Sequence, residues 1–378
     1  MTVTLPAESH PTPSMPQIPR SARTEGSSTF DPDRFFEAWA KGEITAPSDN
    51  DFKKSIQTAF GLPSRDNYVY KAVAAVSLEQ AQAHVAAGGN NGLHGWYKTS
   101  EGQPRPPPSS ADIAAYVDIF RPTTNTSKAL KALGSNAKKG TVREDVAKHL
   151  LALYAPPDDS RKLVVSKSKT HPNPYFDVWA WACQNLEWAG PEEKTAEVKI
   201  SHAILPVFYH HFGCVVPSYE SLAFIQQVAR GRNILDVGSG NGYWCYALRS
   251  FDSNPKKKMT VTPIDNGLSE WRTLWVADTI EVDGAKWLQQ NNGGLDDVLL
   301  LVYPMVGNDF TSKMLKAYRG TTIISAGAQN SSGFTAFKSE TIADWTGREM
   351  PSWEKVLQVP LPSFAGKDEA LFIFEKKQ

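Results

Sequence analysis

Three glycines spaced two positions apart carry the strongest chemical signal in this chain. They lie within residues 234–243, which read Ile-Leu-Asp-Val-Gly-Ser-Gly-Asn-Gly-Tyr, so that an apolar strand enters a tight turn and then opens a helix. A glycine has no Cβ atom and lets the backbone approach a ligand closely, while a helix N-terminus presents free N–H groups. The segment therefore predicts a ligand-binding loop.

The spacing of this loop departs from the dinucleotide-binding fingerprint G-x-G-x-x-G. Its third glycine comes one residue early, Tyr243 stands where that fingerprint has glycine, and Asp236 precedes the first glycine by two positions. The pattern D-x-G-x-G-x-G closely resembles motif I of the class I S-adenosylmethionine-dependent methyltransferases. The resemblance implies that the loop packs under the methionine and ribose of the cofactor, and that Asp236 helps to hold the loop and the amino group.

Further positions resemble that family over about residues 204–378. Asp265 ends the second expected strand, where the family has an acidic residue that takes both ribose hydroxyls, and a carboxylate can accept both bonds. Asp283 and Gly284 follow the third strand, where the family usually has an acidic residue near the adenine. Without the family, Asp265 is an ordinary residue at a strand end and Asp283 a helix N-cap. Tyr303 follows the fourth strand, where methyl acceptors commonly lie.

The resemblance implies S-adenosyl-L-methionine as cofactor and no metal. The residues expected to bind the cofactor are Asp236, Gly238, Ser239, Gly240, Asn241, Gly242, Asp265, Asn266, Asp283 and Gly284. The candidate catalytic residues are His210, His211 and Tyr303. A histidine just before the glycine loop could act as a general base or orient the acceptor, and the alternative is a purely structural pair. The N-P-P-Y motif of amino-methylating enzymes is absent, since the fourth strand continues as Val302-Tyr303-Pro304-Met305.

The elements that must position these residues change character near residue 233. From there short apolar strands alternate with helices, a pattern typical of a parallel sheet covered on both faces. Strands are expected at 233–237, 259–264, 279–282, 297–303, 321–325, 354–359 and 370–375. The last two predict an antiparallel hairpin, which gives a seven-stranded, mostly parallel, doubly wound α/β sheet. Pro263 makes the boundary of the second strand uncertain, because proline removes a ladder donor.

The first half of the chain predicts a different organisation. Residues 1–29 are rich in Pro, Ser and Thr and predict a disordered tail, residues 30–200 a mostly helical N-terminal lid domain, and residues 201–378 the cofactor-binding domain. Helices are expected at 50–60, 66–87, 110–120, 126–133 and 141–154, after an N-cap at Asp31-Pro32. The aromatic run 175–188 and the segment 204–212 are expected to form the wall and roof of the acceptor site.

Composition limits the partners and the compartment. Forty basic residues balance forty acidic ones, and 41% of the residues are hydrophobic, as in a folded soluble protein. Three scattered cysteines argue against a disulfide scaffold or a zinc site, and the longest apolar run is far below the roughly 20 residues of a membrane span. These features predict a cytoplasmic protein, with the nucleus as an alternative location, and no membrane partner.

Three functions remain open at this level. The first is a methyltransferase that acts on an O or N nucleophile of a small molecule, which the balanced net charge favours slightly. The second is an RNA or protein methyltransferase that docks through region 121–169, where eleven basic residues face four acidic ones. The same charges also suit a solvated helical face. The third is an inactive cofactor-binding scaffold, against which the intact glycines and acidic positions speak.

Overall fold

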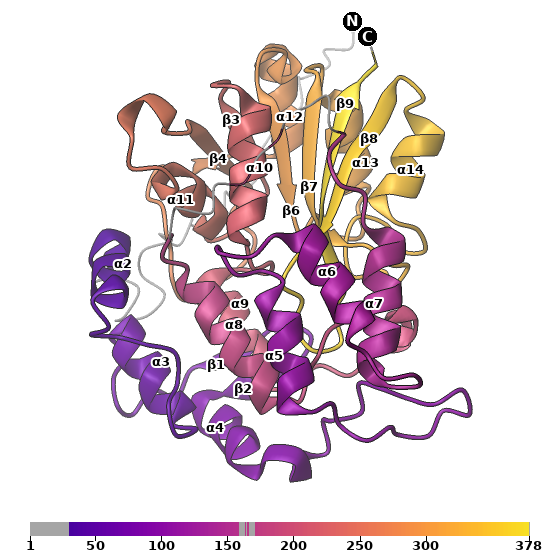
Figure 1. The fold of residues 1–378 in the computed structure, drawn as a ribbon. Helices are drawn as coiled ribbons and strands as arrows, with labels where there is room; N and C mark the ends of the chain where they lie inside the picture. Colours follow the sequence, from indigo (N-terminus) through magenta and orange to yellow (C-terminus); the bar gives the residue numbers. More distant parts are fainter. Residues whose placement is uncertain (1–29, 159–162, 164, 166–170, 378) are drawn as a thin grey trace, which may run out of the picture.

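A computed structural model describes residues 30–158, 163, 165 and 171–377 of the chain. The expected tail, residues 1–29, lies outside the described residues. A sheet occupies one part of the molecule, and the elements from α2 to α9 gather at one end of it (Figure 1). The N-terminal region is mostly helical, as the sequence predicts. That residues 201–378 form a domain of their own stays a prediction.

The N-terminal elements follow the sequence pattern with one exception. They are α2 (Pro32–Ala40), α3 (Phe52–Phe60), β1 (Val69–Lys71), β2 (Ala75–Ser77), α4 (Leu78–Ala87), a 3-10 turn (Gly88–Asn91), α5 (Ser110–Asp118), α6 (Thr126–Ser135), α7 (Val142–Leu153), α8 (Pro174–Asn185) and a 3-10 turn (Glu193–Glu197). Asp31 caps α2 by accepting the backbone N–H groups of Asp33 and Arg34. This is the N-cap expected from the Asp-Pro pair.

The prediction of a single helix over 66–87 is wrong for the first half of that stretch. That stretch contains a short antiparallel pair, β1 and β2, before α4 begins. Tyr70 and Val76 are buried between more exposed neighbours, which is the alternation of a strand pair. The helix starts only at Ser77, whose hydroxyl accepts the N–H of Gln80 in a capping box.

The C-terminal half forms the predicted sheet. Its strands are β3 (Ile234–Val237), β4 (Val261–Asp265), β5 (Ile280–Glu281), β6 (Val298–Val302), β7 (Thr322–Ala328), β8 (Trp353–Pro360) and β9 (Glu369–Lys376), in the order β5-β4-β3-β6-β7-β9-β8. The first five strands in that order are parallel, and β9 pairs antiparallel with both β7 and β8. The seven-stranded, mostly parallel sheet with an antiparallel C-terminal hairpin is confirmed.

Pro263 lies inside β4 without breaking the sheet. The Ile264 carbonyl accepts from Gly238 toward β3, whereas the Asp265 carbonyl accepts from Val282 toward β5. Because backbone polar groups alternate sides along a strand, Pro263 faces β5 like Asp265. The short β5 pairs only with Ile264 and Asp265, so the missing N–H of Pro263 costs no ladder bond.

Helices cover both faces of the sheet, and each face has its own hydrophobic cluster. On one face α9 (Leu205–Phe212), α10 (Tyr219–Ala229) and α11 (Tyr243–Ser250) pack against Leu300 and Ile324. This cluster continues without interruption into α3, α5 and α8. On the other face α12 (Gly284–Gln290), α13 (Phe310–Ala317) and α14 (Ile342–Glu349) pack against Leu299 and Ile323. The N-terminal elements therefore extend the core of only one face.

Among the described residues, no helix is both long and apolar enough to cross a membrane.

Candidate functional site

A cavity of about 300 Å³ lies at the carboxyl ends of the parallel strands. Ligands in open α/β sheets bind at this edge, and the volume is at the lower end of the range for small-molecule sites. Most of the residues predicted from sequence line it, namely Gly238, Ser239, Gly240, Asn241, Asp265, Asn266, Asp283, Gly284 and Tyr303. The expected site thus comes together from loops that follow β3, β4, β5 and β6.

Two glycines of the loop after β3 need the freedom that a missing Cβ provides. Gly238 has φ of 79° and Gly240 has φ of 57°, in the left-handed region that side chains disfavour. A Cβ on Gly240 would also lie 2.9 Å from the indole of Trp271, and one on Gly238 would lie 3.3 Å from the Phe310 ring. The two rings line the same cavity. A larger residue at Gly238 or Gly240 would therefore press against the Phe310 or the Trp271 ring.

Asp265 fixes the glycine loop from the end of β4. Its Oδ2 accepts the N–H of Gly240 at 2.9 Å, and its Oδ1 accepts the N–H of Gly267 at 2.8 Å. A carboxylate has about four acceptor positions, so both oxygens can accept further hydroxyl groups from the cavity side. Asp265 is 9% exposed, which leaves such contact open.

Asp283 and Gly284 begin α12 at the opposite rim. The Asp283 Oδ1 accepts the N–H of Lys286 at 2.9 Å, so this residue is a helix N-cap while also lining the cavity. A Cβ on Gly284 would lie 2.4 Å from Val237 Cγ1. Glycine is therefore needed here for the close approach of α12 to β3.

Asp236 and Gly242 were expected in the site but do not line the cavity. Asp236 is fully buried, and neither carboxylate oxygen has a hydrogen-bond partner among the described residues. Burial, with the nearby charge of Asp265, raises the pKa of Asp236 to about 7. Gly242 begins α11, where a Cβ would lie 2.3 Å from Val276 Cγ2. Gly242 thus serves packing, and Asp236 is a buried polar group that lacks a partner.

Tyr303 lies where the cavity meets the N-terminal half. Its φ is 49°, which is unusual for a non-glycine residue, and its N–H donates to Ala326 at 2.7 Å. Its ring stands 5.8 Å from that of Tyr209 in a T-shaped pair. Burial raises the pKa of Tyr303, and the charges of Cys214 and Glu369 add to this. Backbone strain of this kind concentrates at functional sites.

The structure does not bring the two histidines to the cavity wall. The His211 ring is fully buried, its Nε2 lies 2.9 Å from the Tyr70 hydroxyl and its Nδ1 lies 2.8 Å from Thr273 Oγ1. The His210 Nε2 lies 2.8 Å from the Lys71 carbonyl oxygen. Burial holds the pKa of His211 well below its usual value. This arrangement supports the structural alternative, because neither histidine lines the cavity, although the His210 ring lies 6.3 Å from the ring of the lining residue Trp271.

The backbone of His211 has the clearer role in the site. Its carbonyl accepts the Asn241 side-chain amide at 3.2 Å and the Trp275 indole N–H at 2.6 Å. The Asn241 carbonyl in turn accepts the N–H of Trp275 at 2.8 Å. The end of α9, the glycine loop and the loop after β4 are thereby joined by hydrogen bonds.

Arg272, which the sequence did not single out, anchors the loop after β4 to the N-terminal half. It is 1% exposed and binds both carboxylate oxygens of Asp66, at 2.8 and 3.1 Å. Its guanidinium also lies over the Tyr68 ring, 4.2 Å from the centroid. The two charged partners are separated by 206 positions, so no local pattern could reveal the pair. The same loop carries Trp271 and Ser269 to the cavity.

The aromatic run 175–188 lies behind the cavity instead of lining it. Most of its aromatic residues belong to α8, where the buried Trp179 packs against Tyr116 and Phe120. The link to the site is indirect, because the Tyr175 hydroxyl donates to the carbonyl of Gly213 at 2.5 Å. The segment 204–212 reaches the cavity through Phe212 at its end, next to Gly213 and Cys214.

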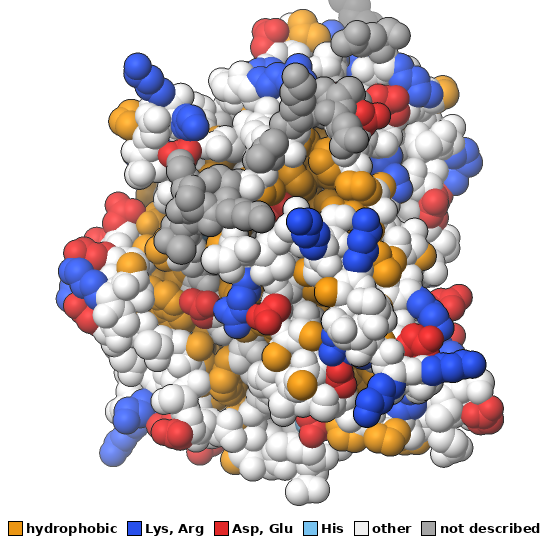
Figure 2. Space-filling view, in the orientation of Figure 1, with side chains coloured by type: hydrophobic (Ala, Val, Ile, Leu, Met, Phe, Trp, Pro, Cys, Tyr) orange, Lys and Arg blue, Asp and Glu red, His pale blue; other side chains and the backbone are white. Residues whose placement is uncertain are grey.

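The basic excess of region 121–169 is partly neutralised in the structure. Arg121 pairs with Asp118, Arg143 with Asp112, and Lys148 with Glu144. On the face shown in Figure 2, basic side chains are scattered among acidic and uncharged ones. Four of the eleven basic residues, Arg161, Lys162, Lys167 and Lys169, lie outside the described residues.

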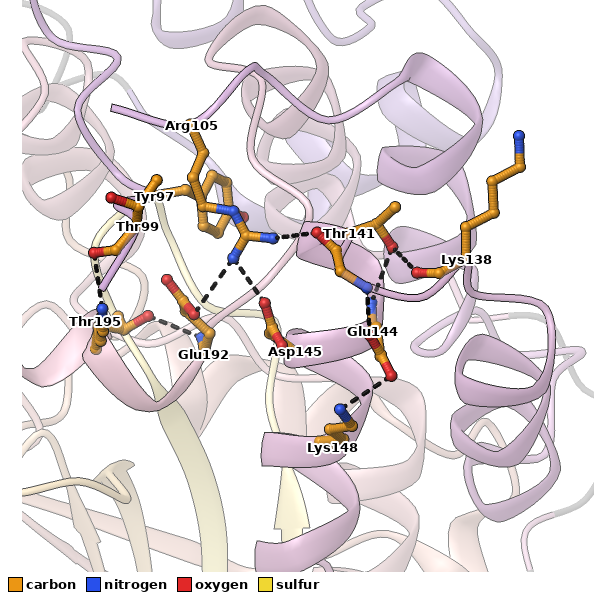
Figure 3. A network of polar contacts seen from close by, with 12 residues as sticks. Tyr97, Thr99, Arg105, Lys138, Thr141, Glu144, Asp145, Lys148, Glu192 and Thr195 are labelled. Carbon is orange, nitrogen blue, oxygen red and sulfur yellow. Dashed lines mark hydrogen bonds and ion pairs between the residues drawn. The ribbon is translucent and has the colours of Figure 1, made fainter. Parts of the chain in front are cut away.

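A polar network joins the same region to the rest of the N-terminal half (Figure 3). The Arg105 guanidinium donates to Asp145 at 2.6 Å and to the Gly140 carbonyl at 3.1 Å, and it lies 3.9 Å from Glu192. Glu144 accepts the N–H of Gly140 and pairs with Lys148. These contacts use the charges to connect α7 with its neighbouring loops.

Within the described ranges, no group of three or more His, Cys, Asp or Glu side chains could hold a metal ion.

No protein-family model matches the chain, and no curated protein sequence matches it. Several solved structures do match. One is the 1,6-didemethyltoxoflavin-N1-methyltransferase of Burkholderia thailandensis with its acceptor and S-adenosylhomocysteine (12% identity, TM-score 0.31, 42% of this chain and 78% of that chain). Another is the magnesium protoporphyrin IX methyltransferase of Synechocystis PCC 6803 with S-adenosylmethionine (12% identity, TM-score 0.28, 70% of this chain and 97% of that chain).

A third match is the trans-methyltransferase CalH in complex with S-adenosylhomocysteine (11% identity, TM-score 0.33, 70% of this chain and 88% of that chain). All three proteins are methyltransferases solved with S-adenosylmethionine or its demethylated product. A likeness at this level does not extend to function, so the residues of the cavity have to carry any functional proposal.

Proposed function

We propose that this protein is an S-adenosylmethionine-dependent methyltransferase that acts on a small molecule. The observation that carries the proposal is the cavity itself, in which the glycine loop, Asp265 and Asp283 meet at the carboxyl edge of the sheet. The resemblance to the class I S-adenosylmethionine-dependent methyltransferases assigns each of these residues to the cofactor. Their convergence from separate strands is what a cofactor site requires.

The residues present fit the cofactor. Gly238 and Gly240 line the cavity together with the Phe310 and Trp271 rings, so that the loop presents its backbone to a ligand. Asp265 retains acceptor capacity for the ribose hydroxyls, and Asp283 lies at the rim proposed for the adenine.

S-adenosylmethionine supplies a methyl group that its sulfonium already activates. The protein therefore has to orient the acceptor, exclude water and leave a lone pair free, which is mainly a matter of positioning. Tyr303, held in its strained conformation beside Cys214, would form the acceptor side of the cavity. Trp271 and Phe310 would shield the cofactor side from solvent.

The cavity at the carboxyl edge of the sheet favours a small-molecule acceptor over RNA or protein. A cavity of about 300 Å³ takes a small ligand. In region 121–169, by contrast, Arg121, Arg143 and Lys148 are already paired with acidic side chains, which reduces the charge available for docking RNA. Intact glycines and acidic residues in the right places speak against an inactive scaffold. We place the transfer on an O or N nucleophile.

Calorimetry with S-adenosylhomocysteine, S-adenosylmethionine and NADH tests the cofactor. Binding of the first two, with no heat of binding for NADH, is expected from the loop spacing. Stabilisation by NADH alone would overturn the proposal. Radiolabelled S-adenosylmethionine incubated with separate metabolite, RNA and protein fractions of a cell extract then tests the acceptor, and label is expected in the metabolite fraction. Label confined to RNA or protein would contradict the small-molecule assignment.

A further inference from the structure

One wall of the cavity has a composition that the cofactor does not explain. It consists of Phe212 and Cys214, at the end of α9 and just after it, and of Tyr303, Pro304 and Met305, which follow β6. The residues assigned to the cofactor come instead from the end of β4 and from the loops after β3, β4 and β5. We call these five residues the acceptor wall.

The two parts of the acceptor wall are held next to each other. The ring of Tyr209, in α9, lies 5.8 Å from the ring of Tyr303 in a T-shaped pair. The backbone after β6 is fixed as well, because the N–H of Tyr303 donates to the Ala326 carbonyl and the Pro304 carbonyl accepts the N–H of Ala336, each at 2.7 Å. The acceptor wall is therefore a fixed surface that a ligand meets already formed.

The cavity opens to solvent beside this wall. Met305 lines the cavity and is nevertheless 49% exposed. Asn266 and Ser269, in the loop after β4, also line it and are exposed. Because β4 and β6 flank β3 in the sheet, the loops after these two strands lie on either side of the glycine loop. A ligand can therefore enter between them, and Met305 stands at the rim on the acceptor side.

The acceptor wall carries no charge. Among the described residues that line the cavity, Asp265 and Asp283 are the only ones with an Asp, Glu, Lys, Arg or His side chain, and both are assigned to the cofactor. Burial raises the pKa of Cys214, so that its thiol stays neutral. An anionic ligand on this wall would lose its hydration without meeting a cation, and a cationic one would lie close to the sulfonium of the methyl donor. An uncharged ligand avoids both costs.

The side chains of the acceptor wall suit an aromatic ring. Phe212 and Tyr303 contribute two rings, and Cys214 and Met305 contribute two sulfur atoms. Aromatic rings attract one another in offset or edge-to-face contact, and a methionine sulfur packs favourably against a ring. A saturated ring of the same size would bury a similar apolar area without these contacts. The wall therefore favours an aromatic ligand over a saturated one.

We propose that the methyl acceptor is an uncharged aromatic small molecule, which enters past Met305 and packs its ring on the acceptor wall. The assignment rests on the proposed methyltransferase function and narrows its substrate class. It also makes Met305 a specificity-determining residue, because a charge at this position would change which ligands the wall accepts.

The experiment compares four probes of matched size, namely benzyl alcohol, cyclohexylmethanol, benzoate and benzylamine. Their binding to the full-length protein is measured at neutral pH by ligand-observed NMR titration, with and without S-adenosylhomocysteine. Benzyl alcohol is expected to bind at least about tenfold more tightly than benzoate or benzylamine, which lack a partner for their charge. It is also expected to bind more tightly than cyclohexylmethanol, which lacks the ring contacts.

A pair of matched variants tests the place of binding. Met305→Lys puts a cation on the acceptor wall, so benzoate should bind it at least as tightly as benzyl alcohol, while its affinity for S-adenosylhomocysteine stays unchanged. The control Leu268→Lys puts the same charge on the loop after β4, at a residue that is 84% exposed and does not line the cavity. This control should keep the preference of the wild type for benzyl alcohol.

Several results would overturn the proposal. These are a wild-type protein that prefers benzoate or benzylamine, binds the saturated and the aromatic alcohol equally, or binds none of the probes. The proposal also fails if Met305→Lys retains the wild-type preference, or if Leu268→Lys changes it as much as Met305→Lys does. A wild-type protein that prefers benzyl alcohol but does not bind S-adenosylhomocysteine would instead count against the methyltransferase assignment alone.

Discussion

The Oδ2 atom of Asp265 accepts the backbone N–H of Gly240 at 2.9 Å. The other oxygen of this carboxylate accepts the N–H of Gly267, so one side chain at the end of β4 orders two loops on different sides of the cavity. The residue assigned to the ribose hydroxyls therefore also shapes the loop that lies under the cofactor. Replacing Asp265 should therefore weaken cofactor binding both by removing the acceptor for the ribose hydroxyls and by loosening the glycine loop.

Asp265→Ala should weaken S-adenosylhomocysteine binding by more than about 1.5 kcal/mol, or roughly 12-fold in Kd. The variant loses two charge-assisted hydrogen bonds to the loops as well as the acceptors for the ribose. Calorimetric titration measures the change, and Asp296→Ala, at an exposed position of the same half, serves as the control. An unchanged Kd in Asp265→Ala would remove this residue from the cofactor site.

Gly240→Ala should reduce binding through the position of the added methyl group. The new Cβ would lie 2.9 Å from Trp271 in a residue with φ of 57°, so both sterics and backbone strain oppose it. The strain alone costs about 1 kcal/mol. In the background of Trp271→Ala, the same substitution should cost less, because the clash with the indole is gone. Equal losses of S-adenosylhomocysteine affinity in both backgrounds would show that the two residues do not interact.

Asp236→Asn should change how stability depends on pH. The pKa of Asp236 is about 7 in the folded protein and near 3.8 in the unfolded chain, so between these values the folded state keeps a proton that the unfolded chain releases. The free energy of unfolding of the wild-type protein therefore falls as pH rises from about 4 to about 7, by about 1.4 kcal/mol for each pH unit.

The asparagine variant lacks this titration. It should unfold with a free energy similar to that of the wild type at pH 4.5 and exceed it by at least about 1 kcal/mol at pH 8. Urea unfolding at the two pH values measures the difference. Parallel pH curves for the two proteins would mean that Asp236 is not a buried, unpartnered carboxyl group.

Arg272→Met should destabilise the protein by about 3–5 kcal/mol, because it leaves Asp66 as a buried charge without its partner. The double variant Arg272→Met, Asp66→Leu should recover much of that loss. The exposed pair Lys41–Glu37 provides the comparison, and its removal should destabilise the protein far less, because solvent screens the two charges. Guanidinium unfolding curves measure all of these changes. A small effect of Arg272→Met would show that the loop after β4 is held by its other contacts.

Local chemistry explains why the glycine loop and the sheet could be predicted. The positive φ values of Gly238 and Gly240 require glycine, so residue type alone marks the turn. The buried strands are continuous apolar runs bounded by turn residues, and such runs indicate a parallel sheet. The strand pair β1–β2 was not predicted, because strands of three residues are too short to show an alternation of apolar and polar residues next to a helix.

The sequence by itself determined the order of the strands along the chain and many of the residues that line the cavity, because the loops after parallel strands meet at one edge of the sheet. Only the tertiary structure decided what each polar residue contacts. It buried His211 between Tyr70 and Thr273, paired Arg272 with Asp66, and left the carboxyl group of Asp236 without a hydrogen-bond partner among the described residues. These outcomes depend on contacts between residues up to about 200 positions apart, for which local spacing carries no information. The same type of side chain therefore plays different parts at different positions, because the free-energy cost of burying a charge depends on where the residue lies in the fold and on what it contacts there.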